Sequence, residues 1–269
     1  MARRPAGQAQ GGELIALAMA AALLIFVGRE AVRTSRETAA RRPPTSEVVD
    51  DTAPAPAPAV APEPARVDSA ALKRARTRID PAELRRRIDV GSPGTYIGDM
   101  LRDRDSLLTR WPERTMEPIR VWIQRSATFP DWTPDLTRAA RAAFDEWGEV
   151  GVPVRFTFTV DSTRADIRVN FVDEMTDGNR LGVTTHQHDQ DGWIVSAEVT
   201  VATHDTAGTA LAQPLIAAIA RHEVGHALGL AHSKDRATIM YPESQTLTIT
   251  GPDRATLKLL YTLPPGSVK

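Results

Sequence analysis

The chain has 269 residues, with 33 Lys and Arg against 34 Asp and Glu, a formal charge of −1 and no cysteine. The near-neutral charge argues against a nucleic-acid partner, because such binding needs a net basic face. The lack of cysteine excludes disulfides, thiol nucleophiles and thiolate metal sites, so any bound metal must be held by His, Asp or Glu.

The first 30 residues have the pattern of an export signal. Arg3 and Arg4 precede an apolar run from Leu14 to Val27, which is short for a membrane span of about 20 residues and typical of a signal peptide. No clear cleavage site follows, so a cleaved signal peptide and an uncleaved single-pass signal-anchor both stay open. A buried helix of a soluble protein is the third alternative. Both export interpretations place the rest of the chain outside the cytoplasm, either membrane-anchored or secreted (extracellular or periplasmic).

The next two segments are predicted to lie outside the main domain. Residues 31–64 are a Pro/Ala-rich linker, because alternating Pro and Ala favour extended polyproline II. Residues 65–113 form an Arg-rich helical connector or pro-like segment, with a helix expected over 97–108. If this segment inhibits the protein, the carboxylates that could replace a catalytic water are Asp99, Asp103 and Asp105.

Residues 114–269 have the patterns of a globular domain. Alternating apolar residues predict strands at 118–124, 154–160, 165–172, 180–187 and 195–202. Helical spacing predicts helices over 134–147, 213–228 and 253–261, the first of them with a proline in its first turn. This order predicts an α/β (α+β) fold with a twisted, mixed five-stranded sheet.

Three of the six histidines fall in one eleven-residue stretch, HEVGHALGLAH, which begins at residue 222. His222 and His226 are one helical turn apart, so both imidazoles leave the same face and can meet one ion. Gly229 tolerates the left-handed conformation that ends a helix, so His232 can approach from outside. Three imidazoles and one open position suit a single catalytic Zn²⁺.

Glu223, next to the first of these histidines, is the candidate general base. Zinc lowers the pKa of bound water toward about 7 and polarises a peptide carbonyl. Glu223 would take the water's proton and return it to the leaving amine. A short H-E-x-x-H match also arises by chance, but the added glycine and third histidine make the full pattern far more restrictive.

The full pattern resembles the zinc motif of the metzincins. Met240, eight residues after the third histidine in Ile-Met-Tyr-Pro, resembles their Met-turn, where a methionine lies beneath the three imidazoles. Ser233 after the third histidine and Tyr241 after the methionine make the chain most similar to the matrixins, the M10-type peptidases, and we expect a bacterial member. The resemblance covers about 118–261 and implies a metzincin-type zincin catalytic domain over 114–269, with an active-site helix, a Met-turn and a C-terminal helix.

The chain also departs from the animal matrixins. It lacks the prodomain cysteine of their latency switch, and the His-Gly-Asp loop of their second zinc is missing after Phe171. His186, His188 and His204 remain. His186 and His188 share one face of a predicted strand and could bind a second ion, with surface or substrate-cleft histidines as the alternative. Ca²⁺ is the other open cofactor, with candidate ligands in the loop acids Asp173, Asp177, Asp189 and Asp191.

Residues 182–187 precede the active-site helix and resemble the family's edge strand, where substrate docks as an added β-strand. The candidate substrate-binding residues are Val183, Thr184, Thr185 and, beyond the Met-turn, Pro242. The sequence therefore predicts a monomeric zinc-dependent metalloendopeptidase that acts on proteins or peptides outside the cytoplasm. Two alternatives stay open: a module that binds peptides without cleaving them, and an enzyme that hydrolyses a peptidoglycan cross-link.

Overall fold

The structure is a computed structural model, and it describes residues 80–104, 106–129, 131–176 and 180–267. The predicted leader and linker, and the first part of the predicted connector, fall within residues 1–79 and so lie outside the described residues. None of the helices in the described ranges is long and apolar enough to cross a membrane. The signal-anchor therefore stays a prediction.

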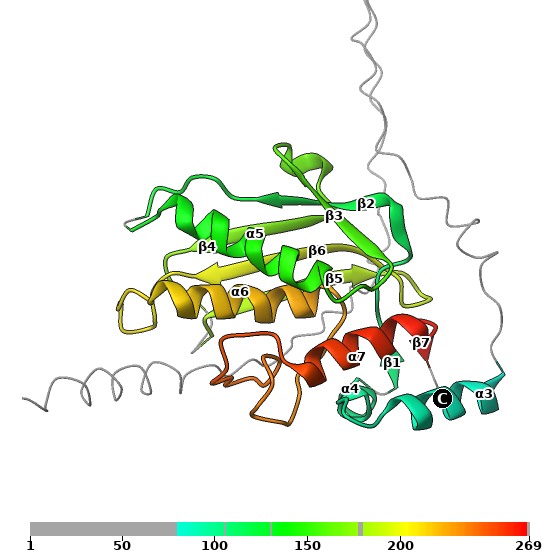
Figure 1. The fold of residues 1–269 in the computed structure, drawn as a ribbon. Helices are drawn as coiled ribbons and strands as arrows, with labels where there is room; N and C mark the ends of the chain where they lie inside the picture. The colour runs from blue at the N-terminus through cyan, green and yellow to red at the C-terminus, as the bar shows by residue number, and fades with distance from the viewer. Residues whose placement is uncertain (1–79, 105, 130, 177–179, 268–269) are drawn as a thin grey trace, which may run out of the picture. The chain divides into compact units, whose positions relative to one another are not determined.

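A five-stranded sheet runs through the centre of the described fold (Figure 1). In spatial order its strands are β3 (Val154–Thr159), β2 (Arg114–Ile123), β4 (Ile167–Val172), β6 (Ile194–Ala202) and β5 (Gly182–His188). The first four strands run parallel to one another, and β5 is antiparallel to β6. The predicted α/β fold with a mixed five-stranded sheet is confirmed, and β5 forms one edge of the sheet.

The alternating sequence pattern explains the strands, as β4 shows by burying Ile167, Val169 and Phe171. Strand β2 begins four residues earlier than expected, at Arg114. The pairing of β2 with β3 shifts register between Arg114 and Ile119, and Pro118 lies within this irregularity. A strand tolerates proline at such a point because a ladder hydrogen bond is already missing there.

Two long helices pack on the sheet. α5 (Pro134–Gly148) contacts β2 and β3, α6 (Gln213–Ala227) contacts β5 and β6, and the two helices lie side by side (Figure 1). Each has a proline in its first turn, where the missing N–H costs no helical hydrogen bond. α6 buries ten of its fifteen residues, as expected for a helix between a sheet and further helices.

A 3-10 turn, η2 (Ser162–Arg164), joins β3 to β4. The remaining elements come from the two ends of the described chain. They are α3 (Pro81–Gly91), α4 (Ile97–Asp103), the short strands β1 (Leu107–Leu108) and β7 (Gly266–Ser267), and α7 (Gly251–Thr262). α4 contacts α7, and β1 pairs with β7. The helix predicted over 97–108 was too long: it ends at Asp103, because Ser106 adopts a left-handed φ of 64° that an α-helix cannot include.

Side chains before residue 114 share the core of the sheet domain. Leu84, Tyr96, Ile97, Met100 and Trp111 belong to the same buried cluster as the strands and α6. A fragment that begins at residue 114 would lack these core side chains. The domain boundary drawn there stays a prediction, and the part of the connector that the structure describes packs on the sheet domain.

Candidate metal centre

The second half of α6 carries two of the three clustered histidines. His222 and His226 lie one turn apart on the same face, and both are buried. Their rings are 4.7 Å apart, centroid to centroid. The predicted placement of two imidazoles on one helical face therefore holds.

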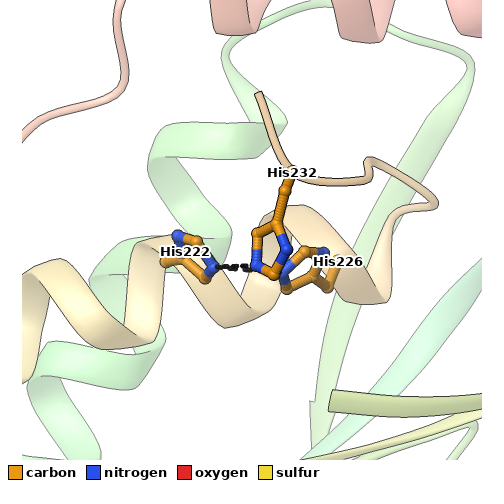
Figure 2. A group of neighbouring side chains, drawn as sticks. All are labelled: His222, His226 and His232. Atoms are coloured by element: carbon orange, nitrogen blue, oxygen red, sulfur yellow. Dashed lines mark hydrogen bonds between the residues drawn. The ribbon is translucent and has the colours of Figure 1, made fainter. Parts of the chain in front are cut away.

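A left-handed turn at Gly229 ends the helix and brings in the third histidine. Gly229 has a φ of 103°, its N–H bonds to the oxygen of His226, and the N–H of Leu230 bonds to the oxygen of Gly225. These two bonds form a Schellman motif, which glycine permits because it has no Cβ. The chain then turns back, and His232 points at the other two imidazoles (Figure 2).

The three Nε2 atoms converge on one point. They are 3.0 Å apart between His222 and His226, 3.3 Å between His222 and His232, and 3.2 Å between His226 and His232. Tetrahedral Zn²⁺ with bonds of about 2.0–2.1 Å would hold three nitrogens about 3.3 Å apart. The donor set and its spacing therefore fit zinc, and these histidines are the one group of three or more potential ligands among the described residues.

Main-chain oxygens orient the two helical imidazoles. Nδ1 of His222 donates to the oxygen of Ile239 at 2.7 Å, and Nδ1 of His226 donates to the oxygen of Leu230 at 2.8 Å. Protonation at Nδ1 leaves each Nε2 with a lone pair for the metal. Burial lowers the pKa of both histidines well below the ordinary value of 6.5, which keeps them in the neutral, ligating form.

Met240 is completely buried beneath α6. A Cβ added to Gly225, which lies between the two helical histidines, would come within 2.5 Å of Sδ of Met240 and 3.1 Å of the Trp147 ring. Met240 is also hydrogen-bonded to Ser233, the residue after His232: Ser233 donates its N–H to the oxygen of Met240 at 2.9 Å. The structure thus places Met240 against the helical face of the site, where the sequence put the Met-turn.

The candidate general base, Glu223, is buried between α6 and β5. Thr184 of β5 donates its hydroxyl to Oε2 of Glu223, 2.7 Å away. Val183 and Thr185 flank Thr184 on the same edge strand, while Pro242 is half-buried directly after the Met-turn. The predicted substrate-binding residues therefore lie on the strand beside the active-site helix and in the loop after Met240.

His186 and His188, the candidates for a second ion, and the remaining His204 have partners within the protein. Nε2 of His186 lies 3.2 Å from the hydroxyl of Thr109, and His188 contacts the oxygen of Asp189. His204 is paired with Asp173 at 2.7 Å and with Asp131 at 3.3 Å, through opposite ring nitrogens that cannot serve one ion. In the part of the chain that the structure describes, these histidines therefore do not form a second metal cluster.

The calcium candidates are turn residues in the structure. One carboxylate oxygen of Asp189 accepts the N–H groups of Asp191 and Trp193, which closes the turn between β5 and β6. Asp177 lies outside the described residues. A calcium site therefore stays a prediction.

Four side chains that support the site were missed by the sequence analysis. Arg104, Trp111 and Tyr261 donate to main-chain oxygens from Ala227 to Leu230, at the end of α6. Buried Asp253 accepts the N–H of Ile239, the residue whose oxygen holds His222. Only the capping pattern at Thr250 and Asp253 offered a local signal, because the other partners lie more than thirty residues from the carbonyls they bind.

A family model described as matrixin matches residues 123–262. The chain is similar to metalloendoproteinase 1-MMP of Arabidopsis thaliana, with 30% identity over 42% of this chain and 33% of the relative. It is also similar to metalloendoproteinase 4-MMP of the same plant, with 35% identity over 40% of this chain and 33% of the relative. Interstitial collagenase of Oryctolagus cuniculus shares 32% identity over 45% of this chain and 28% of the relative.

The chain thus spans about a third of the length of these relatives. They come from a plant and an animal, so they do not support the bacterial origin expected from the sequence. The matched residues include the three convergent histidines, Glu223 and Met240.

Proposed function

The chain belongs to the matrixin family, and on that premise we propose that it is a zinc-dependent metalloendopeptidase that cleaves extended segments of proteins or peptides. The observation that carries the proposal is the convergence of three Nε2 atoms within 3.0–3.3 Å of one another, beside a buried glutamate. That spacing suits a tetrahedral ion with one position left for water or substrate.

His222, His226 and His232 would hold the zinc through Nε2, with the rings of His222 and His226 oriented by the oxygens of Ile239 and Leu230. When bound, zinc would supply a Lewis acid that activates a water molecule and polarises the scissile carbonyl. Glu223 would take the proton of the attacking water on its carboxylate and deliver it to the leaving amine. Burial of Glu223 suits this role, because bulk water is kept from the carboxylate and proton transfer stays local.

Strand β5 would hold the substrate. Its inner edge pairs with β6, and it stands last in the spatial order of the sheet. An extended peptide could add to the outer edge through main-chain hydrogen bonds along Val183, Thr184 and Thr185, largely independent of its sequence. Pro242 and the loop after it would then contribute to side-chain preference. On the basis of the sequence, the proposal also has the protein act as a monomer outside the cytoplasm, either secreted or membrane-tethered.

The test is digestion of an unbiased peptide library by the full chain loaded with zinc, with cleavage sites read by mass spectrometry. The matched control is Glu223→Gln, which keeps the shape of the side chain and the three ligands. We expect cleavage by the wild type, a loss of about 10²-fold or more in the variant, and equal zinc content in both. Absence of cleavage by the zinc-loaded wild type, or equal activity of the variant, would overturn the proposal.

A further inference from the structure

The carboxylate of Glu223 packs against Gly182 and Thr184 of β5. The two residues are two positions apart in the strand, so they lie on the same face, which is the face toward α6. Together they border the carboxylate from two sides, Gly182 against Oε1 and Thr184 against Oε2.

Gly182 supplies the space. A Cβ built at this residue would lie 2.5 Å from Oε1 of Glu223, 2.9 Å from its carboxylate carbon and 2.8 Å from Cγ2 of Ile219. Real Cβ atoms do not approach other atoms so closely, so an alanine would force a displacement. The flexible end of that contact is the Glu223 carboxylate, which would move before the backbone does. Glycine here therefore reflects a close approach of strand to helix.

Thr184 supplies the hydrogen bond. Its hydroxyl lies 2.7 Å from Oε2 of Glu223 and 3.0 Å from the main-chain oxygen of the same residue. A hydroxyl has one proton to donate, and the shorter contact, to the charged oxygen, is the stronger of the two. The second contact keeps the hydroxyl close to the helix backbone. The glutamate is thus tied to the strand that we propose holds the substrate.

We infer that Thr184 is a positioning residue for the general base, and that Gly182 gives the base room to adopt the position that Thr184 holds. The inference rests on the proposed function. A general base acts only from within hydrogen-bond reach of the proton it removes, and small displacements are costly. Thr184 stops rotation of the carboxylate, so the same oxygen is presented in every turnover and no ordering is needed during the reaction.

The test compares kcat, KM and zinc content for the full zinc-loaded chain, with a peptide identified in the library digest. Thr184→Val keeps the shape and removes the donor, and Thr184→Ser restores the donor. Thr157→Val, at an exposed position on β3, makes the same change away from the site. Loss of a hydrogen bond to a charged group predicts a kcat about 10- to 100-fold lower in Thr184→Val. We expect KM and zinc content within about twofold of the wild type, recovery in Thr184→Ser and no change in Thr157→Val.

Gly182→Ala provides a second route that does not depend on the hydroxyl. It is expected to lower kcat by displacing the carboxylate, with zinc content unchanged. The inference is overturned if Thr184→Val keeps kcat within twofold, if Thr184→Ser is as impaired as Thr184→Val, or if the variants lose zinc in parallel with activity. In each of these cases an active wild type leaves the proposed function standing. An inactive zinc-loaded wild type would instead overturn the proposed function, and this inference with it.

Discussion

Trp111 donates its indole N–H to the main-chain oxygen of Ala227, 2.8 Å away, and so joins the segment before β2 to the last residue of α6. The final carbonyls of a helix have no partner within the helix. Here the oxygen of Leu228 accepts the hydroxyl of Tyr261, and the guanidinium of Arg104 donates to the oxygens of Gly229 and Leu230. The turn that delivers His232 is therefore held by side chains from both ends of the described chain.

Replacing Trp111 with Phe should destabilise the protein. The substitution leaves the buried oxygen of Ala227 without its donor and removes part of a fully buried ring, so we expect a loss of about 2–4 kcal/mol in the free energy of unfolding. Urea unfolding of the zinc-loaded chain measures this change. Trp122→Phe, at a half-buried position on β2, is the control and should cost less. Equal losses in the two variants would contradict a specific role for the Trp111 bond.

Replacing Asp253 with Asn should weaken the link between α7 and the Met-turn. One carboxylate oxygen accepts the N–H of Ile239 at 3.0 Å and both the N–H and the hydroxyl of Thr250, while the other accepts the hydroxyl of Tyr96 at 3.2 Å. We expect a loss of about 2–3 kcal/mol, because an amide cannot accept all of these donors. Tyr96→Phe removes only one of them and should cost about 1 kcal/mol.

Thermal unfolding checks this pair of variants, and zinc affinity provides a second measurement. Because Ile239 also accepts the Nδ1–H of His222, Asp253→Asn should bind zinc more weakly than the wild type. An Asp253→Asn protein with wild-type stability and zinc affinity would show that the carboxylate does not support the site.

Gly229→Ala and Gly208→Ala separate backbone strain from steric overlap. Both glycines have positive φ, 103° and 74°, so alanine costs roughly 1–2 kcal/mol at either position. A Cβ at Gly229 would also overlap the main-chain oxygen of Thr109, whereas nothing lies within 4 Å of a Cβ at Gly208. We therefore expect Gly229→Ala to lose more stability and to release zinc, because the turn to His232 opens. Similar melting temperatures and zinc contents for the two variants would argue against this account.

The metal-free protein should lose stability in mild acid. Burial lowers the pKa of His222 and His226 in the folded state well below 6.5, while the unfolded chain titrates near 6.5. Below pH 6.5 the unfolded state therefore binds more protons, and stability falls as pH falls, by up to about 1.4 kcal/mol per pH unit for each histidine. Urea unfolding of chelator-treated protein between pH 8 and 5 measures the slope. His222→Asn removes one of the two groups and should about halve it; an unchanged slope would refute the assignment.

Local spacing was enough to predict the sheet, the three main helices and the convergence of three histidines on one point. His222 and His226 are close because a helix repeats every 3.6 residues, and Gly229 signals the turn to His232. The same reasoning put His186 and His188 on one strand, where their rings are 6.1 Å apart. It could not show that His186 contacts Thr109, because that pairing depends on how a distant segment packs.

The segment before residue 114 was the least predictable part. The sequence predicts a connector or pro-like segment outside the main domain, yet Tyr96, Ile97 and Met100 are buried in the domain core. Arg104 likewise takes part in the fold, since its guanidinium donates to carbonyls more than a hundred residues away in sequence. Contacts between residues so far apart produce no periodic pattern in the sequence, so only the folded structure reveals them.

The bonds from Arg104 and Trp111 to the end of α6 limit how far the chain can be shortened from its N-terminal side. Loss of the residues before β2 would remove the guanidinium of Arg104 from the turn that carries His232, and loss of the residues up to Tyr96 would remove one of the donors to Asp253. An N-terminus that keeps all of these bonds therefore lies before α4. The residues from Tyr96 onward are therefore part of the folded unit that holds the three histidines in place.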